Sequence, residues 1–274
     1  MKINDNPIRY AIGKIFTKKG LFSKKELTKF AVCNENEEPL SAFDYDSIDP
    51  YEDRIATAKV KNRVHYIDLD GKQLLKTYTD GAYNVTRMGD LFKIVQMGSN
   101  YIGLAYRDGT ILIEPKQNFL EVNNDIVIYG DLSPVSFDYR KLGVGKIAGG
   151  RFVTVLPCNY NYVQYLGGRI VAAGRYSVIK TSTPSSLTTN KISETAVPAF
   201  QVYSVDTGKL SDLVFGEIHA TENGNYSAVI FPHVKPDELT YRQQTLSEAF
   251  NGEGLLNLSV KKRVVLNERF EFPQ

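Results

Sequence analysis

Short runs of β-branched and aromatic residues alternate with polar segments along most of the chain. Clear examples are residues 111–113, 126–129, 152–156 and 170–173. Each run is bounded by Gly, Asn, Asp or Pro, and this combination is typical of β-strands. The pattern predicts a mainly β fold.

Turn dipeptides separate these runs. They are Asp70-Gly71, Asp80-Gly81, Asp108-Gly109, Asn223-Gly224 and Asn251-Gly252. Such dipeptides favour tight hairpins, because the central positions of the turn require positive φ. We therefore expect repeated antiparallel hairpins, arranged as an open array, a sandwich or a propeller-like closure, with one or two peripheral helices.

The turns recur with similar flanking residues. Residues 65–75 align with residues 102–112, and the glycines Gly71 and Gly109 stand about 38 residues apart. Weaker copies lie at residues 30–48 and 201–210. A single hairpin cannot bury its apolar face alone, so stacked neighbours are expected.

These units carry a family resemblance. The best-matching segments are Phe43-Asp-Tyr-Asp-Ser-Ile48, Ile67-Asp-Leu-Asp-Gly-Lys72, Leu91-Phe-Lys-Ile-Val95, and Tyr101-Ile-Gly-Leu104 with Asp108-Gly109 and Ile113-Glu-Pro115. Over about residues 30–130 the chain resembles the WG-repeat (KWG-type) family. The Trp-Gly pair of that family is absent, since the chain has no Trp, and Tyr101-Ile102-Gly103 is its nearest counterpart. The resemblance implies a binding platform without fixed catalytic residues.

Three segments differ from the strand pattern. Ser23-Lys-Lys-Glu26 is a capping box that predicts a short helix to about Phe30. Leu239, Gln243, Leu246 and Phe250 have helical spacing and predict an amphipathic helix. Residues 181–198 are rich in Ser and Thr and predict a polar loop or linker. The expected domains are a WG-like repeat region at 1–180, the linker at 181–198, and a C-terminal β unit at 199–274.

Composition narrows the class of protein. The net charge of +2 gives no strong signal for nucleic acid, and the lysines at 18, 19, 24 and 25 are expected to be solvated surface charge. No apolar stretch approaches the roughly 18 residues of a membrane helix, and the first residues have no secretory signal pattern. Cys33 and Cys158 are too few for a disulfide framework. We expect a cytoplasmic protein, or a virion protein if the chain is encoded by a phage.

No constellation of catalytic or metal-binding residues emerges. The histidines His65, His219 and His233 lack partners at metal-ligand spacing. The Gly-rich segment 142–151 lacks the Ser or Thr that would end a phosphate-binding loop. The acidic cluster at residues 44–53 lacks the spacing of a calcium loop. We therefore expect no catalytic residue, cofactor or metal.

Aromatic residues suggest an interface instead. Tyr160 and Tyr162 have strand spacing and are expected to face one side, with Tyr165 nearby. Tyr is enriched at protein interfaces. The candidate interface residues are Tyr160, Tyr162, Tyr165, Leu239, Leu246 and Phe250.

The leading hypothesis is a protein–protein interaction or scaffold module whose partners are proteins. One alternative is a structural subunit of a large assembly, such as a phage or virus particle, which would expose apolar surface and associate. Another is a carbohydrate-active enzyme, which would need two carboxyls about 5–10 Å apart in a cleft.

Overall fold

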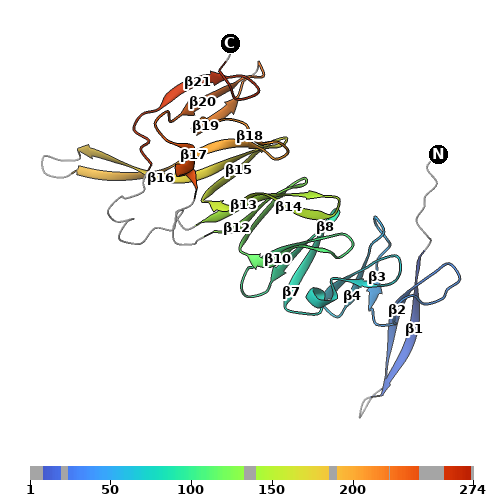
Figure 1. The fold of residues 1–274 in the computed structure, drawn as a ribbon. Helices are drawn as coiled ribbons and strands as arrows, with labels where there is room; N and C mark the ends of the chain where they lie inside the picture. The colour runs from blue at the N-terminus through green and yellow to red at the C-terminus, as the bar shows by residue number, and fades with distance from the viewer. Residues whose placement is uncertain are drawn as a thin grey trace. The chain divides into compact units, whose positions relative to one another are not determined.

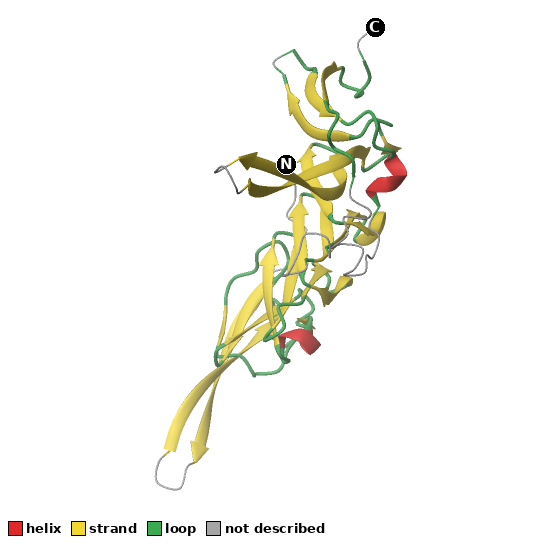
Figure 2. Cartoon of the chain, turned by 90° about the vertical axis from the view of Figure 1, so that its left-hand side faces the viewer, coloured by secondary structure: helices red, strands yellow, loops and turns green. Residues whose placement is uncertain are grey.

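The computed structural model describes residues 9–19, 24–132, 140–184, 190–221, 223–240 and 256–272. Antiparallel sheets dominate it, and Figure 2 shows their strands in yellow. The described helical segments are a single turn, α1 (Lys76–Thr79), and a 3-10 turn, η2 (Pro236–Leu239). The predicted mainly β fold is confirmed.

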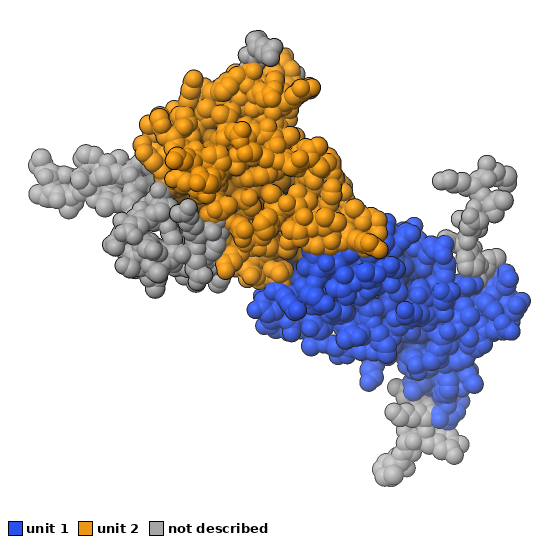
Figure 3. Space-filling model, viewed as in Figure 1, with its two compact units in different colours: residues 1–116 blue, residues 117–274 orange. Residues whose placement is uncertain are grey.

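The chain divides into two compact units, residues 1–116 and residues 117–274, which Figure 3 colours blue and orange. This division differs from the expected one at the polar segment 181–198. No helix in the described part of the chain is both long and apolar enough to cross a membrane.

The first unit consists of a hairpin followed by two four-stranded sheets (Figure 1). In each sheet, strands that are consecutive in the sequence are also hydrogen-bonded neighbours. The hairpin is β1 (Tyr10–Lys19) with β2 (Lys24–Cys33). The first sheet contains β3 (Ser47–Ile48), β4 (Ala56–Val60), β5 (Arg63–Ile67) and β6 (Gln73–Leu74). The second contains β7 (Tyr83–Met88), β8 (Leu91–Gln96), β9 (Ile102–Tyr106) and β10 (Ile111–Gln117).

Apolar contacts join these elements in series. Val32 of the hairpin packs with Ala56, Ala58 and Ile67 of the first sheet. Tyr66 and Leu74 of the first sheet pack with Phe92 and Ile94 of the second. Each sheet therefore buries apolar side chains against its neighbour.

The Asp70-Gly71 and Asp108-Gly109 turns depart from the expected geometry, because only the glycine of each pair has positive φ. Asp68 Oδ1 accepts hydrogen bonds from the backbone N–H groups of Asp70 and Lys72, at 3.0 and 2.9 Å. Gly71 has a φ of 77° and Gly109 a φ of 88°, conformations that glycine adopts at little cost. The hairpins predicted at Asp70-Gly71 and Asp108-Gly109 are confirmed, since they join β5 to β6 and β9 to β10.

The second unit contains another four-stranded sheet and a larger one. The smaller sheet comprises β11 (Phe119–Asn123), β12 (Ile126–Asp131), β13 (Lys141–Ala148) and β14 (Arg151–Tyr160). The larger follows the order β15, β16, β17, β19, β20, β21, with β18 paired to β17. Its strands are β15 (Tyr162–Gly167), β16 (Ile170–Pro184), β17 (Asn190–Ser204), β18 (Gly208–Lys209), β19 (Phe215–Ala220), β20 (Tyr226–Ile230) and β21 (Lys262–Leu266).

The two sheets of the second unit are held by an apolar cluster and by an ion-pair network. Val144 of the smaller sheet packs with Val171 and Ala173 of the larger. Arg169 donates from Nε and Nη2 to Asp206, each at 2.8 Å, and from Nη1 to Asp125. These hydrogen bonds lower the pKa of Asp206 to about 2. The guanidinium therefore connects the β11–β12 turn with the end of β17.

Two local predictions are wrong. The segment predicted as a helix from Ser23 to Phe30 is strand β2 from Lys24 onward, because it pairs with β1 along ten residues. The polar segment predicted as a loop at 181–198 extends strands β16 and β17 in its described part, with Thr181 opposite Ser193. Thr and Val favour extended backbone, which agrees with the strand pair formed here.

Candidate protein interaction surface

The β1–β2 hairpin leaves apolar side chains in solvent on both of its faces. Ile15 is 66% exposed and Phe16 is 40% exposed. They are adjacent in a strand, so their side chains point to opposite faces. A strand that packed one face on the core would hide one of them. This part of the hairpin therefore extends beyond the unit's own core.

The base of the hairpin, in contrast, is firmly attached. Ala31, Val32 and Cys33 are completely buried. Phe30 exchanges backbone hydrogen bonds with Tyr45, with N–O distances of 2.8 and 3.3 Å. The hairpin is thus buried at residues 31–33 and exposed at Ile15 and Phe16.

The hairpin is strongly basic. Residues 10–33 contain six lysines and one glutamate, whereas the whole chain has a net charge of only +2. The strand register places lysine opposite lysine at three positions, Lys14 with Lys29, Lys18 with Lys25, and Lys19 with Lys24. Like charges directly opposite each other destabilise a strand pair. An anionic partner would relieve this repulsion.

Neighbouring groups offset the repulsion between Lys14 and Lys29, the facing lysine pair nearest the core. Lys29 Nζ lies 2.6 Å from Asp46 Oδ1, and this contact lowers the pKa of Asp46. Lys14 Nζ lies 5.7 Å from the ring centroids of both Phe16 and Phe43. Glu26 is the one acidic residue in the sequence of the two strands.

The outer edge of β1 is also unoccupied by any described strand. Among the described strands, β1 pairs with β2 alone, while β2 forms bridges on its other side from Phe30 to Tyr45 and from Cys33 to Pro39. The backbone N–H and C=O groups along such an edge can hydrogen-bond to an added strand. Exposed apolar side chains, positive charge and a free edge thus coincide on β1.

The predicted tyrosines serve mainly as packing residues. Tyr160 is only 7% exposed and meets Tyr203 edge-on at a centroid distance of 6.3 Å. Tyr162 contacts Tyr176 at 5.1 Å, and burial raises the pKa of Tyr162 to about 12. The expectation that Tyr160 and Tyr162 face one side is wrong, because β14 ends at Tyr160, β15 begins at Tyr162, and the two rings join different clusters.

The remaining predicted interface residues are similarly placed or lie elsewhere. Tyr165 is half-buried and donates its hydroxyl to the Gly168 carbonyl oxygen at 3.0 Å. Leu239 is 1% exposed and packs with Phe231 and Leu256. Leu246 and Phe250 lie outside the described residues, as does most of the predicted C-terminal helix.

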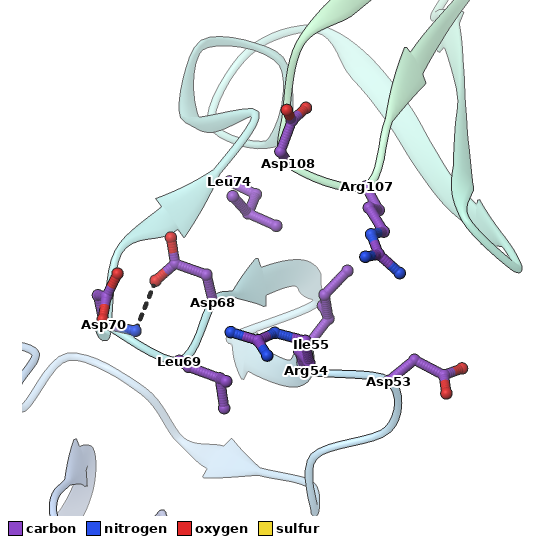
Figure 4. A pocket seen from close by; sticks show the side chains of 9 residues that line it. All are labelled: Asp53, Arg54, Ile55, Asp68, Leu69, Asp70, Leu74, Arg107 and Asp108. Atoms are coloured by element: carbon purple, nitrogen blue, oxygen red, sulfur yellow. Dashed lines mark hydrogen bonds between the residues drawn. The ribbon is translucent and has the colours of Figure 1, made fainter. Parts of the chain in front are cut away.

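A pocket of about 420 Å³ lies between the two sheets of the first unit (Figure 4). Its walls come from the turns before β4, between β5 and β6, and between β9 and β10. Ile55, Leu69 and Leu74 are buried there, while acidic and basic side chains line the rim: Asp53, Arg54, Asp68, Asp70, Arg107 and Asp108. Asp68 is already engaged by its own turn.

His65 occupies a buried polar cluster. Gln73 Nε2 lies 2.6 Å from its Nδ1, and Asp80 Oδ1 lies 3.5 Å away. Its Nε2 has no hydrogen-bond partner in the part of the chain that the structure describes. Burial lowers the pKa of this imidazole, so the ring is neutral near pH 7. The described residues contain no group of three or more His, Cys, Asp or Glu side chains that could hold a metal ion.

The glycine-rich segment and the cysteines have structural roles. Residues 141–148 form strand β13, which continues through Gly143 and Gly145 to a turn at Gly149 and Gly150. Cys33 is buried and Cys158 half-buried, and both are free thiols. The sequence alone did not reveal the β1–β2 surface, because the hairpin register decides which lysines face one another.

No family model and no curated protein matches this chain. A solved structure of KlHsv2 with loop 6CD replaced by a Gly-Ser linker is 14% identical, covering 75% of this chain and 69% of that chain, with a TM-score of 0.28. Kluyveromyces lactis Hsv2p is 13% identical, covering 82% and 76%, with a TM-score of 0.31. Scores this low do not establish a common fold, so function must be inferred from the chain's own geometry.

Proposed function

We propose that this chain is a non-catalytic protein interaction module built from successive β units of the WG-repeat type. The exposed, basic β1–β2 hairpin carries the proposal. Two-stranded ribbons are at best marginally stable alone, and this one leaves Ile15 and Phe16 in solvent on opposite faces. A protein partner that covers both would bury apolar surface without rearranging the core.

Equivalent glycines support the repeat interpretation. Gly103 lies in the third strand of its sheet, where a Cβ would come 2.7 Å from the carbonyl oxygen of Ile113 in the fourth. Gly143 has the same place in its own sheet, with a Cβ position 2.7 Å from the carbonyl oxygen of Leu156. The two are about 40 residues apart, a spacing typical of β repeats. Gly103 belongs to the Tyr101-Ile102-Gly103 segment that stands in for the family's Trp-Gly pair.

The experiment is quantitative affinity capture of the tagged full chain from its own cells, followed by mass spectrometry. We expect one or a few proteins in near-equal amount to the tagged chain. The double variant Ile15→Ser, Phe16→Ser should lose them, because it removes the apolar contacts but no buried residue. The control variant Val153→Ser, Val265→Ser changes valines that are 45% and 51% exposed elsewhere, and should retain them.

Failure to recover any protein above background, or equal recovery with the hairpin variant, would overturn this function. Turnover of a small molecule by the purified chain would favour an enzyme instead.

A further inference from the structure

The free edge of β1 has the dimensions of a strand-binding site. β1 contains ten residues, which span about 34 Å in extended conformation. Half of its backbone polar groups face away from β2, in the alternating pattern of an antiparallel pair. An extended segment placed about 4.8 Å away could pair with them and turn the two-stranded ribbon into a three-stranded sheet.

The positive charge of β1 favours some partner segments over others at this edge. Lys14, Lys18 and Lys19 lie on β1 itself, so two copies of β1 paired in parallel would set each of these lysines opposite its own copy. Lysine residues on an edge strand disfavour pairing of the strand with another copy of itself. An acidic strand would instead be attracted to this edge, because each carboxylate would reduce the repulsion between facing lysines.

The exposed apolar side chains favour a protein over a nucleic acid as the occupant of this edge. Phosphates would neutralise the lysines but would leave Ile15 and Phe16 uncovered. A β-strand presents side chains alternately to the two faces. On β1, Lys14 shares a face with Phe16, and Ile15 points to the opposite face. A segment in which acidic and apolar residues alternate would therefore bring carboxylates to the Lys14 face and apolar side chains to Ile15.

We infer that β1 accepts an acidic, extended protein segment as an added strand, and this inference rests on the proposed function. Main-chain hydrogen bonds along β1 supply affinity that is independent of sequence, while the lysines and the exposed apolar side chains determine which segment is bound.

The test measures binding of fluorescein-labelled peptides to the full chain by anisotropy. The probe is a ten-residue peptide of alternating Glu and Val, matched in length to β1. The comparison ligands are decaglutamate, alternating Lys and Val, and a short DNA duplex. The variant is Lys18→Glu, Lys19→Glu, and its control is Lys72→Glu, Lys116→Glu, two exposed lysines outside the hairpin.

We expect the Glu-Val peptide to bind more tightly than every other ligand. Its affinity should fall about tenfold in the hairpin variant, because two positive charges on β1 become negative. The control variant should bind as the wild type does. Circular dichroism of both variants checks that they are folded.

Equal binding of decaglutamate would overturn the inference in favour of charge alone, and tighter binding of DNA would overturn it in favour of nucleic acid. Absence of peptide binding would also overturn it. The proposed function would survive that last result if captured proteins still depended on Ile15 and Phe16, so the two failures are distinguishable.

Discussion

Replacement of Phe92 by alanine tests whether adjacent sheets of the first unit are held by buried apolar contacts. Phe92 lies on β8, is completely buried, and packs against Tyr66 of the neighbouring sheet at a ring-centroid distance of 4.7 Å. Truncation of a buried Phe to Ala costs about 3–5 kcal/mol, because apolar burial is lost and a cavity remains. That is a large part of the 5–15 kcal/mol that stabilises a typical domain.

The assay is urea unfolding followed by tyrosine fluorescence, since the chain has no Trp. We expect Phe92→Ala to lower the free energy of unfolding by about 3 kcal/mol or more. Met88→Ala, at a position that is 39% exposed on β7, should change it by less than about 0.5 kcal/mol. A loss below about 1 kcal/mol for Phe92→Ala would refute the packing of these two sheets described above.

Three further outcomes follow from the structure. Hydrogen bonds from Arg169 hold the pKa of Asp206 at about 2, below its value in the unfolded chain. The stability that Asp206 contributes is therefore present above about pH 4 and lost as pH falls toward 2. Asp206→Asn should flatten that part of a stability-versus-pH curve. Because burial lowers the pKa of His65, the unfolded chain binds its proton first, so stability should fall as pH drops below about 6.5, and His65→Gln should weaken this dependence in urea titrations at pH 7 and 5. Gly103→Ala should cost about 1–3 kcal/mol in thermal or urea unfolding, because its Cβ would lie 2.7 Å from the Ile113 carbonyl oxygen; an unchanged midpoint would contradict this close approach.

The elements that local chemistry determines could be predicted from the sequence. Asp-Gly pairs favour tight turns, and Gly71 and Gly109 have positive φ there, although Asp70 and Asp108 do not. The apolar run at 126–129 forms part of β12, which is largely buried. Where period and turn chemistry agreed, the strands were predicted correctly.

Elements determined by long-range pairing could not be predicted. The capping-box pattern at Ser23–Glu26 is a local signal, and pairing of β2 with β1 outweighs it. The Ser- and Thr-rich segment lacked an apolar face, but its register with β16 makes it a strand. For the same reason the facing lysines became visible only from the register, and Tyr160, a candidate interface residue in the sequence, is buried.

Amide hydrogen exchange of the full chain, alone and with its captured partner, tests the central claim most directly. An added strand would protect alternate amides of β1, those directed away from β2, across residues 10–19. We predict that exchange at these amides slows on binding while the amides already paired with β2 change little. Slower exchange elsewhere in the chain, with β1 unaffected, would contradict the account.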